Sequence, residues 1–146
     1  MTARAVAKKL GGRRVLGREM SSELELAVAV RAGLPSSALD FVFAKLGEML
    51  GSEAEVYRLI GSARTLRRKR AEGTHLSVRE SDRLARIARL IARAEEALGD
   101  ENRAQRWMLQ PNRALGRSRP LMLLDTDAGA RAVEQVLGRI EGGVYS

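Results

Sequence analysis

The sequence predicts an all-α protein composed of two small helical units. Apolar residues recur at intervals of three and four in most segments, and no stretch makes a convincing sheet. Gly, Ser and Asp residues at the segment ends are typical helix caps. The chain has 146 residues, of which 45% are hydrophobic and 3% aromatic. It can therefore form one domain or two very small ones, with a core of Leu, Ile, Val, Ala and Met.

Residues 1–20 are predicted to form a basic N-terminal arm without fixed structure. The segment is rich in Lys and Arg, and no acidic residue precedes Glu19. An Arg-rich start without acids is also typical of a transit peptide, whereas the continuous apolar core of a secretory signal is missing. No run of about 18 apolar residues occurs in the chain, so neither a membrane-spanning helix nor a membrane partner is expected.

The next two segments are predicted helices. Residues 22–32 are followed by Gly33 and Pro35, which are stop signals. The alternation LELAVAV within this segment also fits a strand, and both alternatives stay open at this point. Ser36 and Ser37 open a second helix, whose apolar face has helical spacing and comprises Leu39, Val42, Phe43, Leu46, Met49 and Leu50.

Two short helices follow, on either side of Gly61, which is expected to permit a tight turn. In the first, residues 52–60, Ser52 is followed three positions later by Glu55, a capping-box pattern. The second, residues 62–71, has Leu66 as its core anchor. Two short helices around a Gly-containing turn are the helix-turn-helix pattern.

The second short helix carries the densest basic cluster of the chain. The formal net charge is +8, and residues 1–80, with 15 basic and 9 acidic residues, hold +6 of it. This balance favours a polyanionic partner. Because a recognition helix places its first turns at base edges, Arg64, Thr65 and Arg68 are candidates for contacts with bases of duplex DNA. Arg67 and Arg70 are candidates for phosphate contacts. The alternative is a solvated face on an ordinary helical bundle.

Cap signals divide the second half of the chain into further helices. Ser77 and Glu80 form a second capping box, at the start of the longest predicted helix, residues 78–98. The remaining boundaries are, in order, caps at Gly99 and Asp100, a helix over 101–109, a stop at Pro111, a loop over 112–120, a short apolar turn over 120–124, an Asp125–Thr126 cap and a last helix over 127–141. The two helical units are expected to meet near residues 73–78.

This second half carries a long ordered set of motif residues, and with it the chain resembles antitoxins of the Xre/MbcA/ParS-like type. The resemblance runs from about Gly33 to Ser146 and is weakest at its N-terminal end. The set comprises Leu76-Ser77, Glu80-Ser81-Asp82-Arg83, Ala88-Arg89, Trp107, Pro111-Asn112, Leu115-Gly116, Pro120-Leu121, Leu124-Asp125-Thr126, Gly129, Val133 and Gly138-Arg139-Ile140. The sequence departs from the family pattern at Met108, Arg117 and Gly142, and the last departure affects the contact expected of the C-terminal tail.

The resemblance implies an architecture and a function. Residues 21–75 would form an Xre-like helix-turn-helix DNA-binding domain, with ARTLRRKRAEG at its recognition helix, and residues 76–146 a helical toxin-binding domain. The implied partner is a RES-domain toxin of a type II toxin–antitoxin system, similar in fold to ADP-ribosyltransferases and acting on NAD⁺. The antitoxin would cover the NAD pocket of the toxin and bind operator DNA to repress its own operon, in the cytoplasm.

The toxin-binding residues are expected in the second half and at its end. Trp107 and the Pro111–Asn112 pair also fit purely local roles as a core anchor and a helix stop. Gly138 lies inside a helix, where glycine costs about 1 kcal/mol relative to alanine, so a second backbone is expected to approach it. The predicted set is Trp107, Asn112, Leu115, Pro120, Gly138, Arg139, Gly143, Val144, Tyr145 and Ser146.

The composition argues against catalysis and against a bound cofactor or metal. The chain has no Cys and one His, His75, and no nucleophile–base pair, carboxylate pair or phosphate-binding Gly loop stands out. A homodimer is expected, because repressors read two half-sites through two-fold symmetry. The alternative functions are a dimeric helix-turn-helix regulator with no toxin partner and, less consistent with the composition, an enzyme acting on nucleic acid or NAD⁺.

Overall fold

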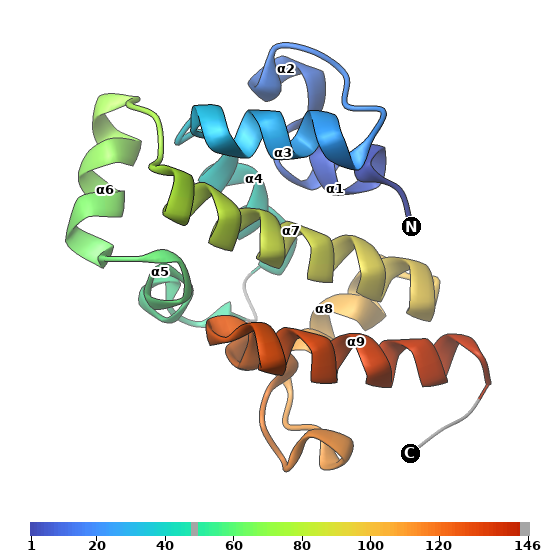
Figure 1. The fold of residues 1–146 in the computed structure, drawn as a ribbon. Coiled ribbons are helices and arrows are strands. Elements are labelled where there is room, and N and C mark those ends of the chain that lie inside the picture. Colours follow the sequence, from blue (N-terminus) through green and yellow to red (C-terminus); the bar gives the residue numbers. More distant parts are fainter. Residues whose placement is uncertain (48–49, 144–146) are drawn as a thin grey trace.

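The computed structural model of the protein describes residues 1–47 and 50–143, and its regular elements over these ranges are helices (Figure 1). Beyond them, the described residues contain only two isolated β-bridges, between Pro35 and His75 and between Asn112 and Ser118. The all-α prediction is therefore confirmed. The elements are α1 (Ala3–Lys9), α2 (Gly12–Leu16), α3 (Glu23–Ala32), α4 (Ala38–Leu46), α5 (Glu53–Ile60), α6 (Ala63–Glu72), α7 (Val78–Leu98), α8 (Glu101–Leu109), η2 (Arg113–Leu115), η3 (Pro120–Asp125) and α9 (Asp127–Glu141).

Helix α7 runs through the middle of the molecule and contacts elements from both halves of the chain. It packs against α1, α3, α4 and α5, and also against α8, η3 and α9. In Figure 1, α3 lies along one side of α7 and α9 along the other. Leu84, Ala88 and Ile91 of α7 are fully buried in a core that includes Leu39 and Leu137. The two halves thus share one core, and the boundary between residues 75 and 76 stays a prediction.

Local cap signals predict the helix ends well. The capping box of Ser77 and Glu80 is confirmed, with both reciprocal hydrogen bonds present at the start of α7. Gly99 ends α7 in the left-handed conformation, with φ +73°. Asp100 caps α8 and Thr126 caps α9 through side-chain oxygens that accept backbone N–H groups. Helix α4 ends at Leu46, before Leu50 of the predicted apolar face, and Met49 of that face lies outside the described residues.

The N-terminal segment differs from the expected free arm, because it folds into α1 and α2. Val6 and Leu10 are fully buried, and α1 packs on α7. Two ion pairs add to this packing: the Lys9 Nζ lies 2.5 Å from Glu95 Oε1, and the N-terminal ammonium lies 3.0 Å from Glu96 Oε2. The apolar residues of α1 are spaced for a helix face, but their basic neighbours obscure the pattern in the sequence.

The segment from residue 22 to residue 32 is the helix α3, so the alternative of a strand is wrong. Ser22 caps it by accepting the Glu25 N–H. The helix ends at Gly33, whose φ of +88° and close approach to the Leu76 carbonyl oxygen leave no room for a Cβ atom. The Leu76 N–H donates a hydrogen bond to the Leu34 carbonyl oxygen at 2.8 Å. This junction joins the end of α3 to the start of α7.

Among the described helices, none combines the length and the apolar character that a membrane-spanning segment requires.

Candidate nucleic-acid interface and partner-binding face

Helices α5 and α6 form the predicted helix-turn-helix pair. Two residues, Gly61 and Ser62, separate them, and the Ser62 hydroxyl caps α6 by accepting the Thr65 N–H. Val56 and Leu66 are fully buried and hold the two helices on the core. Gly61 lies in this short turn as expected, and its backbone, with φ 173°, is extended.

One side of α6 packs against the rest of the protein and is held there by polar contacts. The Ser36 hydroxyl donates to the Lys69 carbonyl oxygen at 3.0 Å. The Lys69 ammonium donates to Glu80 Oε1 at 2.6 Å, and the same carboxylate accepts the Ser77 N–H. Burial disfavours the charge on Glu80, but the hydrogen bonds from Lys69 and Ser77 outweigh it and lower the pKa of Glu80. Helix α6 is thereby held at the N-terminus of α7.

Arg70 lies on this packed side of α6 and not on the side that faces solvent. Its guanidinium contacts the carboxylates of Asp40, at 2.5 Å, and Glu53, at 3.2 Å, and donates to the Tyr57 hydroxyl at 2.9 Å. It also stacks 4.8 Å from the ring centroid of Phe43. Burial works against its charge, but the hydrogen bonds to Tyr57 and Asp40 raise the pKa of Arg70. Because these groups occupy it, we remove Arg70 from the candidate phosphate contacts.

The free side of α6 is basic and faces outward. Arg64, Arg67 and Arg68 are all exposed there, and Thr65 beside them is half-buried. Arg67 lies 5.2 Å from the Tyr57 ring centroid, and Arg68 forms an exposed pair with Glu72 at 3.3 Å. These pairs are weak in water and can exchange for phosphates. We name Arg64, Arg67 and Arg68 the α6 basic row.

Sequence reasoning missed one further basic residue of the helix-turn-helix pair. Arg58 is exposed on α5. The first helix of such a pair crosses the DNA backbone, so this position suits a phosphate contact. The available signal was its place opposite the buried Val56 and Ile60 on the predicted helix.

Glu55 does not complete the capping box predicted at the start of α5. Ser52 instead accepts the Ala54 N–H, and the Glu55 carboxylate accepts two hydrogen bonds from Arg119, at 2.8 and 3.1 Å. The hydrogen bonds from Arg119 lower the pKa of Glu55, even though desolvation opposes them. This contact joins the helix-turn-helix pair to η3.

Four of the residues predicted to bind a toxin, one in α8 and three in the connection between α8 and α9, have structural contacts. Trp107 and Leu115 are half-buried against the core. The Asn112 side chain caps η2 by accepting the Ala114 N–H at 2.9 Å. Pro120 is buried at the first position of η3. These contacts shape the connection, and a direct contact of these residues with a toxin stays a prediction.

The end of α9 presents the other predicted residues to solvent. Gly138, Arg139 and Gly143 are exposed, whereas Val144, Tyr145 and Ser146 lie outside the described residues. Beyond its chain neighbours and the adjacent backbone of its own helix, a Cβ atom at Gly138 would meet no described atom within 4 Å. The close approach expected at Gly138 therefore does not come from a neighbouring segment of the described chain, and the position is open to a partner.

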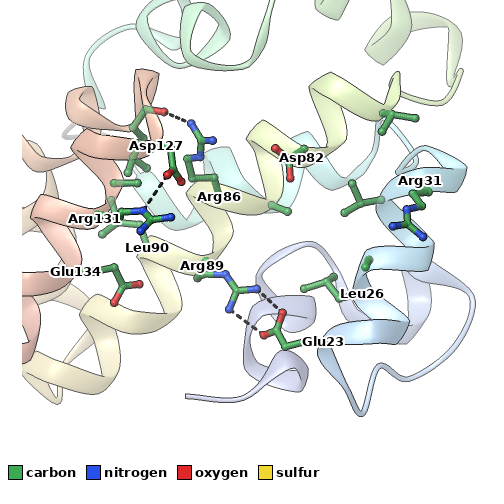
Figure 2. A pocket seen from close by; sticks show the side chains of 16 residues that line it. Glu23, Leu26, Arg31, Asp82, Arg86, Arg89, Leu90, Asp127, Arg131 and Glu134 are labelled. Carbon is green, nitrogen blue, oxygen red and sulfur yellow. Dashed lines mark hydrogen bonds and ion pairs between the residues drawn. The ribbon is translucent and has the colours of Figure 1, made fainter.

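A groove of about 600 Å³ lies between α3, α7 and α9 (Figure 2). Arg89 crosses its floor and holds Glu23 through two hydrogen bonds, at 2.7 and 2.9 Å. The bonds from Arg89 lower the pKa of Glu23, and those same bonds raise the pKa of Arg89. Arg131 pairs with Asp127 on the α9 side. The groove mixes both charge signs with apolar walls, and among the described residues no three His, Cys, Asp or Glu side chains are grouped to hold a metal ion.

Comparisons with known proteins divide the chain in two. Residues 25–89 match the antitoxin Xre-like helix-turn-helix domain, and residues 93–143 match the antitoxin Xre/MbcA/ParS C-terminal toxin-binding domain. The first match covers α5 and α6 and extends into α7. The second covers α8, both short 3₁₀ helices and α9.

Curated relatives carry the same description. "Antitoxin Xre" of Photorhabdus laumondii subsp. laumondii is 31% identical over 137 residues, which are 91% of this chain and 89% of that protein. "Antitoxin Xre" of Yersinia enterocolitica is 38% identical over 96 residues, 64% of this chain and 65% of that protein, just under two thirds of its length. "Prs ADP-ribosylating antitoxin" of Sphingobium sp. is 29% identical over 91 residues, 56% of this chain and 57% of that protein.

Proposed function

Because the chain belongs to the Xre antitoxin family, we propose that it neutralises a cognate RES-domain toxin and binds operator DNA to repress its own operon. It acts as a homodimer in the cytoplasm, without a cofactor, by binding and not by catalysis. The observation that carries this proposal is the separation of two open surfaces. The α6 basic row lies near the start of α7, and the exposed C-terminal end of α9 lies toward the other end of α7 (Figure 1).

The DNA-binding step uses the α6 basic row. Arg64 and Thr65 lie in the first turn of α6, where a recognition helix meets base edges. Arg68, one turn further along the same side, is the third candidate for a base contact, and Arg67 and Arg58 supply charge for the phosphates. The contacts of Ser36, Lys69 and Arg70 hold the opposite side of α6 on the core, so the helix meets the major groove as a rigid element.

The toxin-binding step uses the C-terminal half. Gly138 and Arg139 face solvent at the end of α9, and nothing in the described chain occupies the space above Gly138. A toxin surface can therefore approach the α9 backbone closely. Residues 139–146 then enter or cover the NAD pocket of the toxin and block access to its substrate. The Sphingobium relative is described as a "Prs ADP-ribosylating antitoxin", and these words are compatible with a partner of this chemistry.

Co-expression with the neighbouring gene tests the proposal. A RES-domain toxin expressed alone should stop growth and deplete cellular NAD⁺, and co-expression of this protein should restore both and yield a stable complex. Deletion of residues 143–146 should abolish rescue while DNA binding persists. Arg64→Ala with Arg68→Ala should do the reverse. A folded protein that neither captures nor neutralises such a toxin would leave only the function of a DNA-binding regulator.

A further inference from the structure

Helix α3 has an apolar outer face that the described chain leaves uncovered. The helix, ELELAVAVRA, is apolar around much of its circumference, but only Leu26 is fully buried in the core. Leu24 is 71% exposed and Val28 is 55% exposed. These two side chains are one helical turn apart and form a ridge. A helix that is apolar on several sides is normally covered on them, so this exposure indicates a partner.

Grooves flank this ridge on both sides. On one side lies the groove of about 600 Å³ that Leu26, Ala27 and Val30 share with α7 and α9. On the other lies a groove of about 290 Å³, between α3 and the segment that contains Leu16 and Met20. Helices pack by placing the ridge of one into a groove of the other. A ridge between two grooves can both insert into a matching helix and receive one.

The charges on α3 are arranged for a second, antiparallel α3. Acidic Glu23 and Glu25 occupy its first turn, and Arg31 lies in its last turn. Arg31 is exposed, and no ion pair found among the described residues includes it, whereas Arg89 and Arg18 already bind the two acids. An antiparallel copy would bring each Arg31 to the acidic end of the other helix and would oppose the two helix dipoles favourably.

We infer that α3 is the self-association surface of the protein, where a second copy packs antiparallel with Leu24 and Val28 of each chain at the centre. Such a contact is isologous, because the same surface serves both subunits. It leaves the α6 basic row and the outer end of α9 uncovered, since α6 stands beyond the end of α3 and α9 lies across α7 from it (Figure 1). The inference rests on the proposed function in one respect: a helix-turn-helix protein that binds an operator with two half-sites uses two copies of its chain.

Light scattering and sedimentation of the full chain test this surface. The unmodified protein should have twice the mass of one chain. Combining Leu24→Glu with Val28→Glu should weaken self-association by on the order of 100-fold or more, because four added carboxylates would be brought together at the centre of an apolar contact. The matched control combines Ala128→Glu with Gln135→Glu, which adds the same two charges at exposed positions of α9 and should leave the dimer intact.

A mixing experiment separates loss of the contact from loss of the fold. The double Glu variant and a Leu24→Lys, Val28→Lys variant should each be monomeric alone and should pair when mixed, since opposite charges then meet across α3. A double Glu variant that stays dimeric, a monomeric unmodified protein, or variants that do not pair when mixed would each overturn the inference.

Toxin capture and binding to a single DNA half-site, measured on the same variants, distinguish the two proposals. Both activities should persist in the monomeric variant. If the double Glu variant stays dimeric but loses the toxin, α3 is a toxin surface, and the inference fails while the proposed function stands.

Discussion

Arg119 donates two hydrogen bonds to the Glu55 carboxylate and so joins two regions that are 64 residues apart in the sequence. Glu55 lies on the first helix of the DNA-binding pair, and Arg119 immediately precedes η3, which packs against α9. A side-chain contact therefore lies between the half of the protein proposed to bind a toxin and the half proposed to bind DNA.

Arg119→Gln should lower the free energy of unfolding by about 0.5–1 kcal/mol near neutral pH, because a half-exposed bidentate pair is lost. The pKa of Glu55 is lowered in the folded state, so its stabilisation is present above the ordinary carboxyl pKa and is lost as the pH falls through the folded pKa. Urea unfolding should thus show a difference between the variant and the unmodified protein near neutral pH that disappears in acid. An equal difference at both pH values would contradict this account.

Arg70→Ala should destabilise the fold by about 2 kcal/mol, because Asp40, Glu53 and the Tyr57 hydroxyl lose their common partner. The control is Arg68→Ala on the exposed side of α6, which should change stability by no more than about 0.5 kcal/mol. Thermal or urea unfolding measures both. Similar stabilities for the two variants would show that Arg70 does not hold α6 to α4 and α5.

Alanine at members of the α6 basic row should weaken binding to duplex DNA and change its salt dependence. Each lost phosphate contact should reduce the log–log slope of affinity against salt by about 1. Arg67→Ala should weaken binding to all sequences similarly, whereas Arg64→Ala should also reduce the preference for the operator. Fluorescence anisotropy at several salt concentrations measures both effects. A slope that does not change in either variant would exclude α6 as the DNA contact.

Glu80→Gln should make the protein less stable near neutral pH and less sensitive to acid. The folded state lowers the pKa of Glu80, so the ionised carboxylate stabilises the fold above its unfolded pKa, and this stabilisation is lost as the pH falls through the folded pKa. Melting temperatures across the acidic range should therefore fall less steeply for the variant. Glu72→Gln, which removes only an exposed pair with Arg68, should melt with the unmodified pH profile.

Two substitutions at Gly138 should separate folding from partner binding. Gly138→Ala should stabilise the protein by up to about 1 kcal/mol, since alanine favours a helix and nothing within 4 Å obstructs its Cβ atom. Gly138→Trp should keep the fold but prevent neutralisation of the toxin, because the large indole side chain would occupy the space through which the toxin surface approaches α9. Calorimetric unfolding and the growth assay measure the two effects. A Trp variant that neutralises normally would place the toxin elsewhere.

The sequence by itself determined most of the helix ends and the identity of the helix-turn-helix pair. Ser77 with Glu80, Asp100 and Thr126 bind backbone groups only three positions away, so their patterns can be read without knowing the fold. The basic row of α6 is likewise visible from helical spacing once Leu66 is placed inward. The ordered motif residues of the second half also predicted the antitoxin family.

Only the tertiary structure decided which charged residues belong to the fold and which remain free to bind a partner. Arg68 and Arg70 are both arginines of one helix, but Arg70 faces Asp40 and Glu53, which α4 and α5 bring to it, while Arg68 faces solvent. Glu55 has the spacing of a cap, and it binds Arg119 instead because the helices place the two side chains together. Residues 3–16 fold for the same reason, since the apolar face of α1 gains free energy only where α7 covers it. Local hydrogen bonds depend on neighbours along the chain, whereas ion pairs and burial depend on which helices meet.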